Sequence, residues 1–487
     1  MEIDEPELAG PSKGKKQATI PVDDAHPFDL EAYISSYNGR TIVDRLSWII
    51  QQCPTLAPQA LQIAMVHVPR LRDPNIATML LHAYEQAVAS GVQENMPSFV
   101  ELSKVDQTWI DELNRRNSED RVKLEVELKT YSSNMIKESI RMAHRDLGEF
   151  FRATGDYQSA LKQYQKLRDV CTTSQHVLDM CLSVLELLIE SRNFNIITSY
   201  VYKAEPALDA TSNMLRNSNQ GPTATAAPPG REKIAAEREK VQSKLDLATA
   251  FAHMAQGTYD KAATYLLKIG SIKSLGHWIG TLVSASDIAI YGTLCALASF
   301  HRSSIKAQLL DNPTFAVYIE QEPYIRELIE AYMASKFKTV LEILDRYSTR
   351  HFLDLYLTSH VVNLTNLIRS HALVLYFQPF TSIKLESLST AFGWTPEYLE
   401  QQVVALIQAG EIQARVDKQN KILKARDIDQ RAVLFTRAMK AGKDMQATNR
   451  KLLLRMRLQQ AELIVKPPKT SQQTTAHPNE LGAAFDQ

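Results

Sequence analysis

A short unit recurs along the chain at intervals of about 40 residues, with one interval lengthened by an insertion, and this is the spacing of paired helices in repeat proteins. In each copy a small or polar residue precedes an aromatic one, and a residue three positions later can pack beneath the ring. The copies are Gly155-Asp156-Tyr157 with Ala160, Asn193-Phe194 with Ile197, Gly257-Thr258-Tyr259 with Ala262, Ser299-Phe300 with Ser303, and Ser335-Lys336-Phe337 with Val340. We expect Asp156, Thr258 and Ser335 to cap the following helices. Such helix pairs stack into an α-solenoid, because one pair alone cannot bury its apolar face.

The helical-repeat domain is predicted to span residues 28–285. Apolar residues spaced by three and four mark its first helices, as in Ile42, Leu46, Ile49 and Ile50. Residues 206–230 are rich in Asn, Gly and Pro, so they are predicted to form a flexible loop inserted in one repeat. Residues 1–27 contain four prolines and no hydrophobic period, which predicts a disordered tail.

After about residue 375 the pattern changes to that of a winged helix, predicted for residues 380–428. A short helix with apolar residues comes first, comprising Ile383, Leu385, Leu388, Ala391 and Phe392. Thr395 is expected to cap a second helix that begins at Pro396 and extends to Ala409. Two strands then follow and form a hairpin, one from Ile412 to Val416 and one from Lys421 to Ala425. The fold class is therefore all-α dominated, with a small β-hairpin.

Residues 429–465 are predicted to form a long C-terminal helix, and residues 466–487 a second disordered tail. The helix carries an apolar stripe but is too exposed to be held by this chain alone. We expect the stripe to pack on helices of other chains. Three of its residues are predicted contact residues: Leu452, Met456 and Leu463.

The sequence carries none of the usual motifs for catalysis, metal binding or phosphate binding. It contains no His-x-His, His-Glu-x-x-His, Cys-x-x-Cys or Gly-x-Ser-x-Gly. We therefore predict no enzyme activity, no catalytic residue, no metal site and no cofactor. The nearest approach to a ligand cluster is His351, His360 and His371, which point in different directions when placed on helices. The cysteines lie in apolar helical runs and are predicted to be reduced, buried core thiols, namely Cys53, Cys171, Cys181 and Cys295.

The charge balance gives no reason to expect a nucleic acid or a membrane as partner. Lys plus Arg and Asp plus Glu number 55 each. Winged helices often read DNA with their second helix, so nucleic-acid binding stays an alternative. Here the second helix carries Glu397 and Glu400 but no Lys or Arg, and it repels phosphate, although the wing itself is basic through Lys418, Lys421, Lys424 and Arg426. No stretch reaches the roughly 18 apolar residues of a membrane span, and we expect a protein of the nucleus and cytoplasm.

Three segments resemble one family of proteins. They are Ile412–Asp417 with Lys421–Arg431, Ile288–Ala298 and Ser199–Glu205. Together with a solenoid joined to a winged helix, they are similar to the PCI-domain subunits, and among these to the first-subunit family of the COP9 signalosome. The paralogous proteasome-lid family is the runner-up. The resemblance places a PCI domain at residues 286–428.

The resemblance implies a non-catalytic scaffold. Members of the family join through their winged helices and gather their C-terminal helices into a bundle. Their complex removes the ubiquitin-like modifier Nedd8 from cullins, and the catalytic zinc sits in a different subunit. The implied partners are other signalosome subunits, above all the second and the third. Contact with cullin-RING ligases is implied to be indirect.

The wing is where we expect a neighbouring winged helix to pair, because an open strand edge accepts another strand. Alternation along the strands places Ile412 toward the core, together with Ala414, Val416 and Leu423, and leaves Arg415 and Ile422 on the outer face. Gln413 is predicted to present its backbone N–H to the open edge. The predicted interaction residues of the wing are thus Ile412, Gln413, Arg415 and Ile422.

Overall fold

The structure, a computed structural model, describes residues 22–89, 107–218, 230–426 and 430–463. The N-terminal half of these ranges contains α1 (Leu30–Ser35), α2 (Arg40–Gln52), α3 (Ala57–His67), η1 (Val68–Arg70), α4 (Asn75–Ala89), α6 (Gln107–Ser133), α7 (Lys137–Ala153), α8 (Tyr157–Val170), α9 (Ser174–Glu190), η2 (Phe194–Ile196), α10 (Ile197–Ser218), α11 (Gly230–Ala255) and α12 (Tyr259–Lys268). The C-terminal half contains α13 (Ile272–Leu275), α14 (Trp278–Thr281), α15 (Ala285–Ser299), α16 (Arg302–Ile305), η3 (Lys306–Leu310), α17 (Pro313–Ile319), α18 (Pro323–Met333), α19 (Phe337–Arg346), α20 (Ser348–Phe352), α21 (Thr358–Phe377), β1 (Ser382–Lys384), α22 (Leu385–Phe392), α23 (Pro396–Ala409), β2 (Ala414–Asp417), β3 (Ile422–Ala425) and α24 (Gln430–Gln460).

Contacts divide the chain into two compact units. One comprises Met1–Ile412 with Val416–Leu423, and the other Gln413–Arg415 with Lys424–Gln487. Among the described residues, no helix has the length and apolar character needed to cross a membrane.

The predicted repeat is confirmed by four turns with the same backbone hydrogen bonds. At each turn a residue two positions before the aromatic has a positive φ, namely Gly155, Arg192, Gly257 and Ser335. The next residue donates its N–H to the carbonyl five positions earlier, in the pairs Asp156 to Phe151, Asn193 to Leu188, Thr258 to His253 and Lys336 to Ala331, with N···O distances of 2.9 to 3.0 Å. This is the Schellman ending of an α-helix, repeated. The copy at Phe300 departs from it, because Phe300 has extended backbone and donates to Ala296 four positions earlier.

The caps of the repeat follow the prediction at only one position. Asp156 accepts a hydrogen bond from the Ser159 backbone N–H, as an N-cap residue does. Thr258 occupies the N-cap position, but its hydroxyl donates backward to the His253 carbonyl. Ser335 is not a cap, because Lys336 holds that position. The left-handed turn therefore defines the repeat, and the capping side chain varies.

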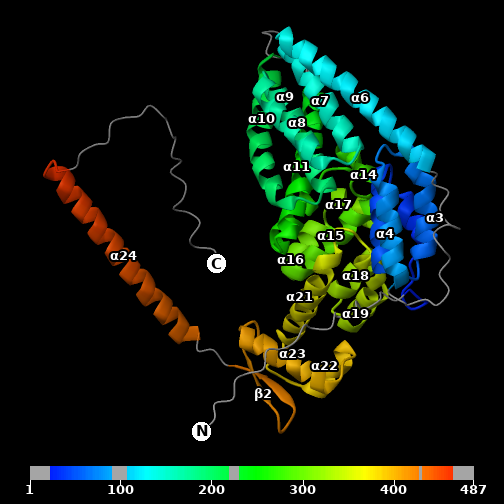
Figure 1. Cartoon of the computed structure of the whole chain (residues 1–487). Coiled ribbons are helices and arrows are strands. Elements are labelled where there is room, and N and C mark those ends of the chain that lie inside the picture. The colour runs from blue at the N-terminus through cyan, green and yellow to red at the C-terminus, as the bar shows by residue number, and fades with distance from the viewer. Residues whose placement is uncertain (1–21, 90–106, 219–229, 427–429, 464–487) are drawn as a thin grey trace, which may run out of the picture. The chain divides into compact units, whose positions relative to one another are not determined.

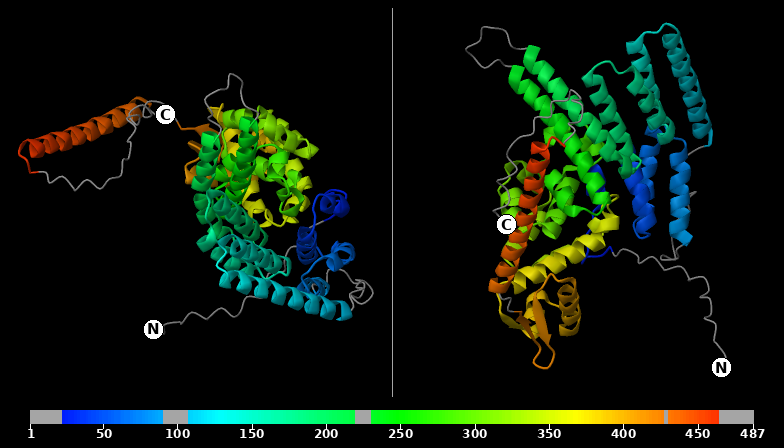
Figure 2. Two further views of the ribbon diagram at one scale, coloured as in Figure 1. Left: turned by 90° about the horizontal axis from the view of Figure 1, so that it is seen from above. Right: turned by 90° about the vertical axis from the view of Figure 1, so that its left-hand side faces the viewer.

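Helix pairs pack beside one another in the order of the sequence. Helices α6 to α12 contact their neighbours successively, and α12 then packs on α15 (Figures 1 and 2). The all-α solenoid followed by a winged helix and a long C-terminal helix is thus confirmed as the fold class. The predicted border at 285/286 falls inside α15, directly after its first residue Ala285, and α15 packs on α12 of the solenoid.

Two predicted unstructured segments are partly ordered. Residues 22–27 of the predicted N-terminal tail are described, and Val22 packs partly against the core of α1 to α4. The predicted loop 206–230 is wrong over residues 206–218, which continue α10 with Pro206 inside the helix, and at Gly230, where α11 begins. Buried Ala204, Ala207 and Leu208 hold this part of the helix in place despite the proline. Residues 219–229, 1–21 and 466–487 lie outside the described residues.

The winged helix contains one strand more than predicted. Its sheet has the order β1-β3-β2, so the hairpin is extended by β1. Ile383, predicted to begin a helix, lies in β1, and the helix starts at Leu385. Pro396 opens α23 as expected, and α22 and α23 end at Gly393 and Gly410, both with positive φ. The Thr395 side chain makes no cap hydrogen bond, contrary to the prediction.

Candidate assembly interface

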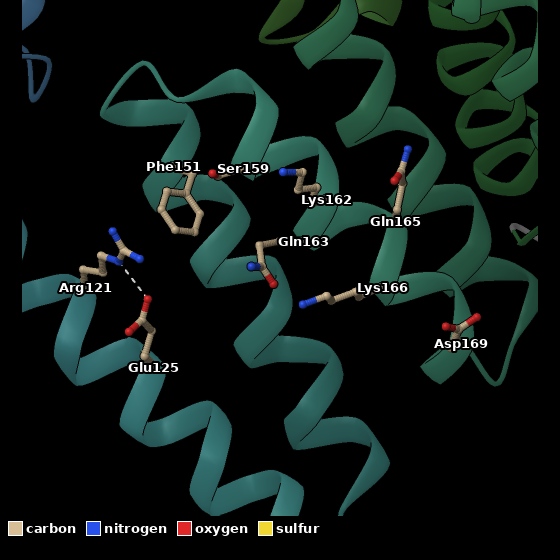
Figure 3. A pocket seen from close by; sticks show the side chains of 9 residues that line it. All are labelled: Arg121, Glu125, Phe151, Ser159, Lys162, Gln163, Gln165, Lys166 and Asp169. Carbon is tan, nitrogen blue, oxygen red and sulfur yellow. Dashed lines mark hydrogen bonds and ion pairs between the residues drawn. The ribbon is translucent and has the colours of Figure 1, made fainter.

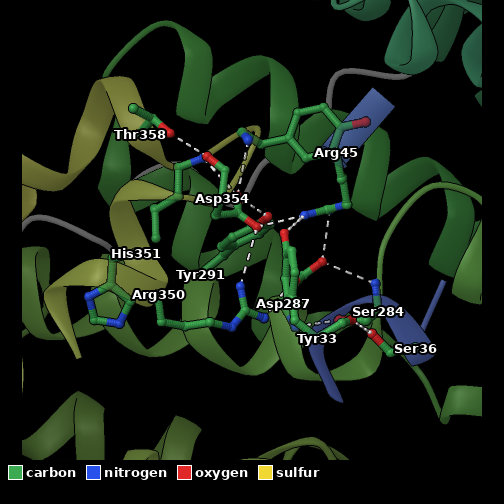
Figure 4. Close-up of polar contacts among 12 residues, drawn as sticks. Tyr33, Ser36, Arg45, Ser284, Asp287, Tyr291, Arg350, His351, Asp354 and Thr358 are labelled. Carbon is green, nitrogen blue, oxygen red and sulfur yellow. Dashed lines mark hydrogen bonds and ion pairs between the residues drawn. The ribbon is translucent and has the colours of Figure 1, made fainter. Parts of the chain in front are cut away.

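A set of four charged residues, three buried and one half-buried, joins the N-terminal helices to the region before the winged helix (Figure 4). Arg45 of α2 pairs with Asp287 of α15 at 3.0 Å and with Asp354, just before α21, at 2.9 Å. Arg350 of α20 pairs with the other oxygen of Asp287 at 3.0 Å. We call Arg45, Asp287, Arg350 and Asp354 the charged junction. Its two positive and two negative charges balance, which is the condition for burying charge at tolerable cost.

Tyrosine hydroxyl groups supply further hydrogen bonds to the charged junction. Tyr37 donates its hydroxyl to Asp287 at 2.5 Å, and Tyr291 donates to Asp354 at 2.6 Å. Burial alone raises the pKa of the Asp287 carboxyl, but Arg45 and Arg350 outweigh it and hold that pKa below its usual value. Burial raises the pKa of the Tyr33 hydroxyl, which accepts from Arg45, to about 12. At neutral pH the carboxylate is therefore charged and the tyrosine is neutral.

A second junction ties α2 to the first repeat turn. Arg40 pairs with Asp73 at 2.7 Å and lies over the Tyr157 ring, 5.2 Å from its centroid. Gly155 has φ +83°, and a Cβ there would overlap the Asp73 carboxylate. Glycine is thus required at this turn both for its conformation and for the close approach of Asp73.

Aromatic stacking anchors the winged helix to the helices before it. Phe392 of α22 stacks on Phe337 of α19, with ring centroids 5.5 Å apart and planes 7° from parallel. Tyr376 of α21 meets both rings edge-on. Helices α19 and α21 therefore support α22 and α23, and β1 packs on α22.

The wing hairpin is shaped by an Asp-based turn. The Asp417 carboxylate accepts from the backbone N–H groups of Gln419 and Asn420, both at 3.2 Å, and from the Asn420 amide at 3.0 Å. Ile412, Ala414 and Leu423 are buried as predicted, and Arg415 is exposed. Ile422 is half-buried, and so is Val416, which was predicted to face the core. Ile412, 4% exposed, therefore serves packing, while Arg415 and Ile422 lie on the outer face.

The predicted direction of the Gln413 backbone is wrong. Its carbonyl accepts the Arg426 N–H at 2.9 Å, which places this peptide edge toward the β3 side of the hairpin. A strand residue turns its N–H and C=O to the same side, and successive residues alternate. Ala414 and Val416 therefore point their backbone groups away from β3, toward the outer edge of the sheet. The edge available to a partner strand is carried by these two residues.

The predicted contact residues of the C-terminal helix lie on its surface. Leu452 and Met456 of α24 are 52% and 64% exposed, and Leu463 lies three residues beyond the end of the helix. From Arg431 to Leu463 every described side chain is exposed. Large apolar side chains in water on this scale are unusual for a monomer and mark an interaction surface. That these residues contact a partner stays a prediction.

The histidines singled out in the sequence lie in separate surroundings. His351 is buried, bonds to the Tyr324 hydroxyl at 3.1 Å, and has a pKa lowered to about 3 by burial and by Arg350. His360 instead lies 3.2 Å from the Tyr259 hydroxyl. Among the described residues, no group of three or more His, Cys, Asp or Glu side chains is placed to hold a metal ion.

The cysteines are buried as predicted, except that Cys171 is only half-buried. Burial raises the thiol pKa of Cys181 to about 11 and that of Cys295 to about 12, and it also raises that of Cys171. These thiols are protonated at neutral pH and are poor nucleophiles.

A surface hollow between α6 and α8 offers no enclosed chemistry (Figure 3). Arg121 pairs with Glu125 at 2.7 Å and lies over the Phe151 ring, while Lys162 and Lys166 are exposed. A ligand site typically buries a few polar groups among apolar walls, and these exposed side chains do not provide one.

The charged junction was missed in the sequence. Arg45 lies among Ile42, Leu46 and Ile49 on the apolar face of α2, and Asp287 opens a nearly continuous apolar helix. A charged residue in such a position is the signal that predicts a buried ion pair, but it does not identify the partner.

Comparisons with known proteins agree with this architecture. Residues 106–308 match the family model of the 26S proteasome subunit RPN7, and residues 344–427 match that of the PCI domain. The COP9 signalosome complex subunit 1 of Arabidopsis thaliana is 34% identical over 90% of this chain and 91% of its own length. This chain belongs to the COP9 signalosome subunit 1 family. Subunit 1b of Drosophila melanogaster is 32% identical over 90% of this chain and 86% of its own length.

Proposed function

We propose that this chain is a non-catalytic scaffold subunit of a COP9 signalosome complex. It holds neighbouring subunits, the second and third among them, and thereby supports removal of Nedd8 from cullins by another subunit. It works in the nucleus and the cytoplasm. Membership of the subunit 1 family supports the assembly.

The observation that carries the scaffold role is the exposed helix α24. Helix α24 has 31 residues and exposes large apolar side chains to water, and such side chains contribute stability only when a partner covers them. The open outer edge of β2 provides a second surface of the same kind.

The test is affinity purification of the tagged full-length chain, followed by a cleavage assay on Nedd8–cullin conjugates. We expect the other signalosome subunits to co-elute and the assembly to cleave, while the homogeneous chain alone does not. Cleavage by the homogeneous chain, or recovery of the chain only as a monomer, overturns the proposal.

The match to the RPN7 model makes the proteasome lid the second candidate assembly. The same purification separates the two, because lid subunits co-elute in that case.

A nucleic-acid role is favoured by four exposed basic side chains on the wing, namely Lys418, Lys421, Lys424 and Arg426. Binding of duplex DNA by the full chain at physiological salt, about 0.15 M, tests it.

A further inference from the structure

Helices α1 to α4 form a small module with a hydrophobic core of its own. The core contains 22 buried residues, and all of them except Leu353 come from residues 30–87. Of the half-buried residues packed against this core, only Trp109 lies outside residues 22–89. We call residues 22–89 the N-terminal module. Its apolar packing is almost complete without the rest of the chain.

The N-terminal module contacts the beginning of the solenoid through polar groups. The Asn117 amide of α6 donates a hydrogen bond to the Arg72 carbonyl at 2.9 Å. The second junction, described above, reaches the repeat turn before α8. At the next repeat turn, the Arg192 guanidinium lies over the Trp48 ring, 5.4 Å from its centroid. These contacts are hydrogen bonds and cation–π contacts.

Other residues of the N-terminal module contact the region before the winged helix. The Asn38 backbone N–H donates to the Gly280 carbonyl at 2.7 Å. The charged junction joins Arg45 to α15 and to the segment before α21. In the left view of Figure 2 the module, in blue, lies between α6, in cyan, and the yellow-green helices that precede the winged helix. The N-terminal module therefore connects two distant parts of the helical region.

This connection fixes the curvature of the solenoid. Helices α6, α7 and α8 pack mainly on their sequence neighbours. In such an array the curvature is the sum of small rotations between neighbouring pairs, and small changes accumulate. Because the docked module joins α6 to α15 across several repeats, it fixes that sum. It thereby also fixes where α6 to α8 lie relative to α19 and α21, which support the winged helix.

The docking interface separates more easily than the core of the module unfolds. Attraction between buried charges is largely offset by the loss of their hydration, so the charged junction adds little net stability to docking. Polar interfaces between domains of one chain allow relative motion, whereas large apolar interfaces do not. Only Leu353 extends the buried core of the module across this interface.

We propose that the N-terminal module detaches from the solenoid as a folded unit, and that its docking sets the curvature of the solenoid. Detachment hydrates Asp287 and Asp354 and lets the repeats rotate, which moves α6 to α8 relative to the winged helix. This conformational change is a property of the chain itself. It goes beyond the proposed function and is tested without partner chains.

The first measurement is hydrogen–deuterium exchange of the full-length chain, read by mass spectrometry with fragmentation to single residues. The Asn38 amide reports docking because its acceptor lies outside the module, and the amides of residues 76–87 report unfolding of the module. Arg45→Met should accelerate exchange at Asn38 at least about tenfold, because a carboxylate then lacks compensation in the docked state. Exchange at residues 76–87 should change less than about twofold. Arg238→Met, which removes an exposed ion pair within the solenoid, should change neither.

A second variant weakens docking without removing a buried charge. Arg192→Gly removes the cation over Trp48 and suits the positive φ of this turn, where other copies of the repeat have Gly155 and Gly257. The Asn38 amide should then exchange about two- to fivefold faster, which is the effect of losing one exposed cation–π contact.

The second measurement is the distance between two nitroxide spin labels, obtained by double electron–electron resonance. The labels are attached at Lys162→Cys on α8 and Glu327→Cys on α18, both exposed positions. Half-buried Cys171 is replaced by serine so that it takes no label. Arg45→Met should broaden or shift the distance distribution, because the curvature is no longer fixed by docking.

Equal acceleration at Asn38 and at residues 76–87 would mean that the module unfolds instead of detaching, and this result overturns the inference. An unchanged Asn38 amide in both variants overturns it as well. A faster Asn38 amide with an unchanged distance distribution also overturns it, because docking then does not set the curvature. None of these results bears on whether the chain enters a signalosome assembly, so the proposed function is judged separately.

Discussion

Replacing Arg45 by methionine tests whether the charged junction holds the N-terminal helices in place. Methionine keeps a similar apolar stem but removes the guanidinium that contacts Asp287 and Asp354. Arg350 still neutralises Asp287 at 3.0 Å, but it lies 3.8 Å from Asp354. One buried carboxylate is left with weaker compensation, and such a loss costs about 3–5 kcal/mol.

The assay is thermal unfolding by differential scanning calorimetry. At about 2 °C per kcal/mol for a cooperative unit of 150–250 residues, the midpoint should fall by about 6–10 °C. Arg326→Met is the control, because Arg326 pairs with Glu330 at 3.1 Å and both side chains are exposed. We expect less than about 1 kcal/mol from that change, since exposed ion pairs contribute little.

A double-mutant cycle isolates the Arg45 to Asp354 interaction. Asp354→Asn alone leaves Arg45 with less counter-charge, so the combined variant should lose at least about 1 kcal/mol less than the sum of the single changes. Additive effects within about 0.5 kcal/mol, or an Arg45→Met shift no larger than that of Arg326→Met, would refute the reasoning.

Three further changes test the surfaces and the core. Leu452→Glu with Met456→Glu should remove the chain from its assembly without changing its unfolding midpoint, because each side chain that a partner buries contributes about 1.5–3 kcal/mol to binding. Normal co-purification of this double variant would mean that the two residues contact no partner. Val416→Pro should weaken partner binding at constant melting temperature, whereas Arg415→Pro should lower both, and equal behaviour of the two variants would contradict the edge assignment. The pKa of His351 is about 3 in the folded chain and about 6.5 in the unfolded chain. Below pH 6.5 the unfolded state therefore binds a proton that the folded state does not, and the free energy of unfolding falls as the pH is lowered. Relative to His351→Gln, the wild-type chain should lose about 2 kcal/mol between pH 7 and pH 5 in urea titrations, and parallel pH profiles would exclude a buried neutral histidine.

The helical repeat was predictable because its signal is local. A positive φ favours Gly, and Gly155 and Gly257 mark two of the four turns in the sequence itself. The turns at Arg192 and Ser335 use residues that give no such signal, and only the aromatic two positions later reveals them. Backbone geometry is therefore more uniform along the repeat than the residues that produce it.

The failures concern effects that the local sequence does not contain. Pro206 and the residues after it have the composition of a loop, yet packing of Ala207 and Leu208 keeps them helical. The charged junction joins Arg45 to residues more than 200 positions away, and no spacing rule connects such residues. At Pro206 the tertiary contacts override the local preference for a loop, and at the charged junction the local sequence contains no information about which residues pair.

The wing separates what a strand pattern determines from what it leaves open. Alternation of apolar and polar residues fixes which side chains face the core, and Ile412, Ala414 and Leu423 are buried accordingly. The same alternation does not say which peptide groups pair with β3, because backbone direction also alternates and depends on the register of the hairpin. The bond from Arg426 to Gln413 settles that register. The outward-facing backbone groups therefore belong to Ala414 and Val416 and not to Gln413. A proline placed at Gln413, as the sequence alone suggests, would break the hairpin instead of leaving it intact.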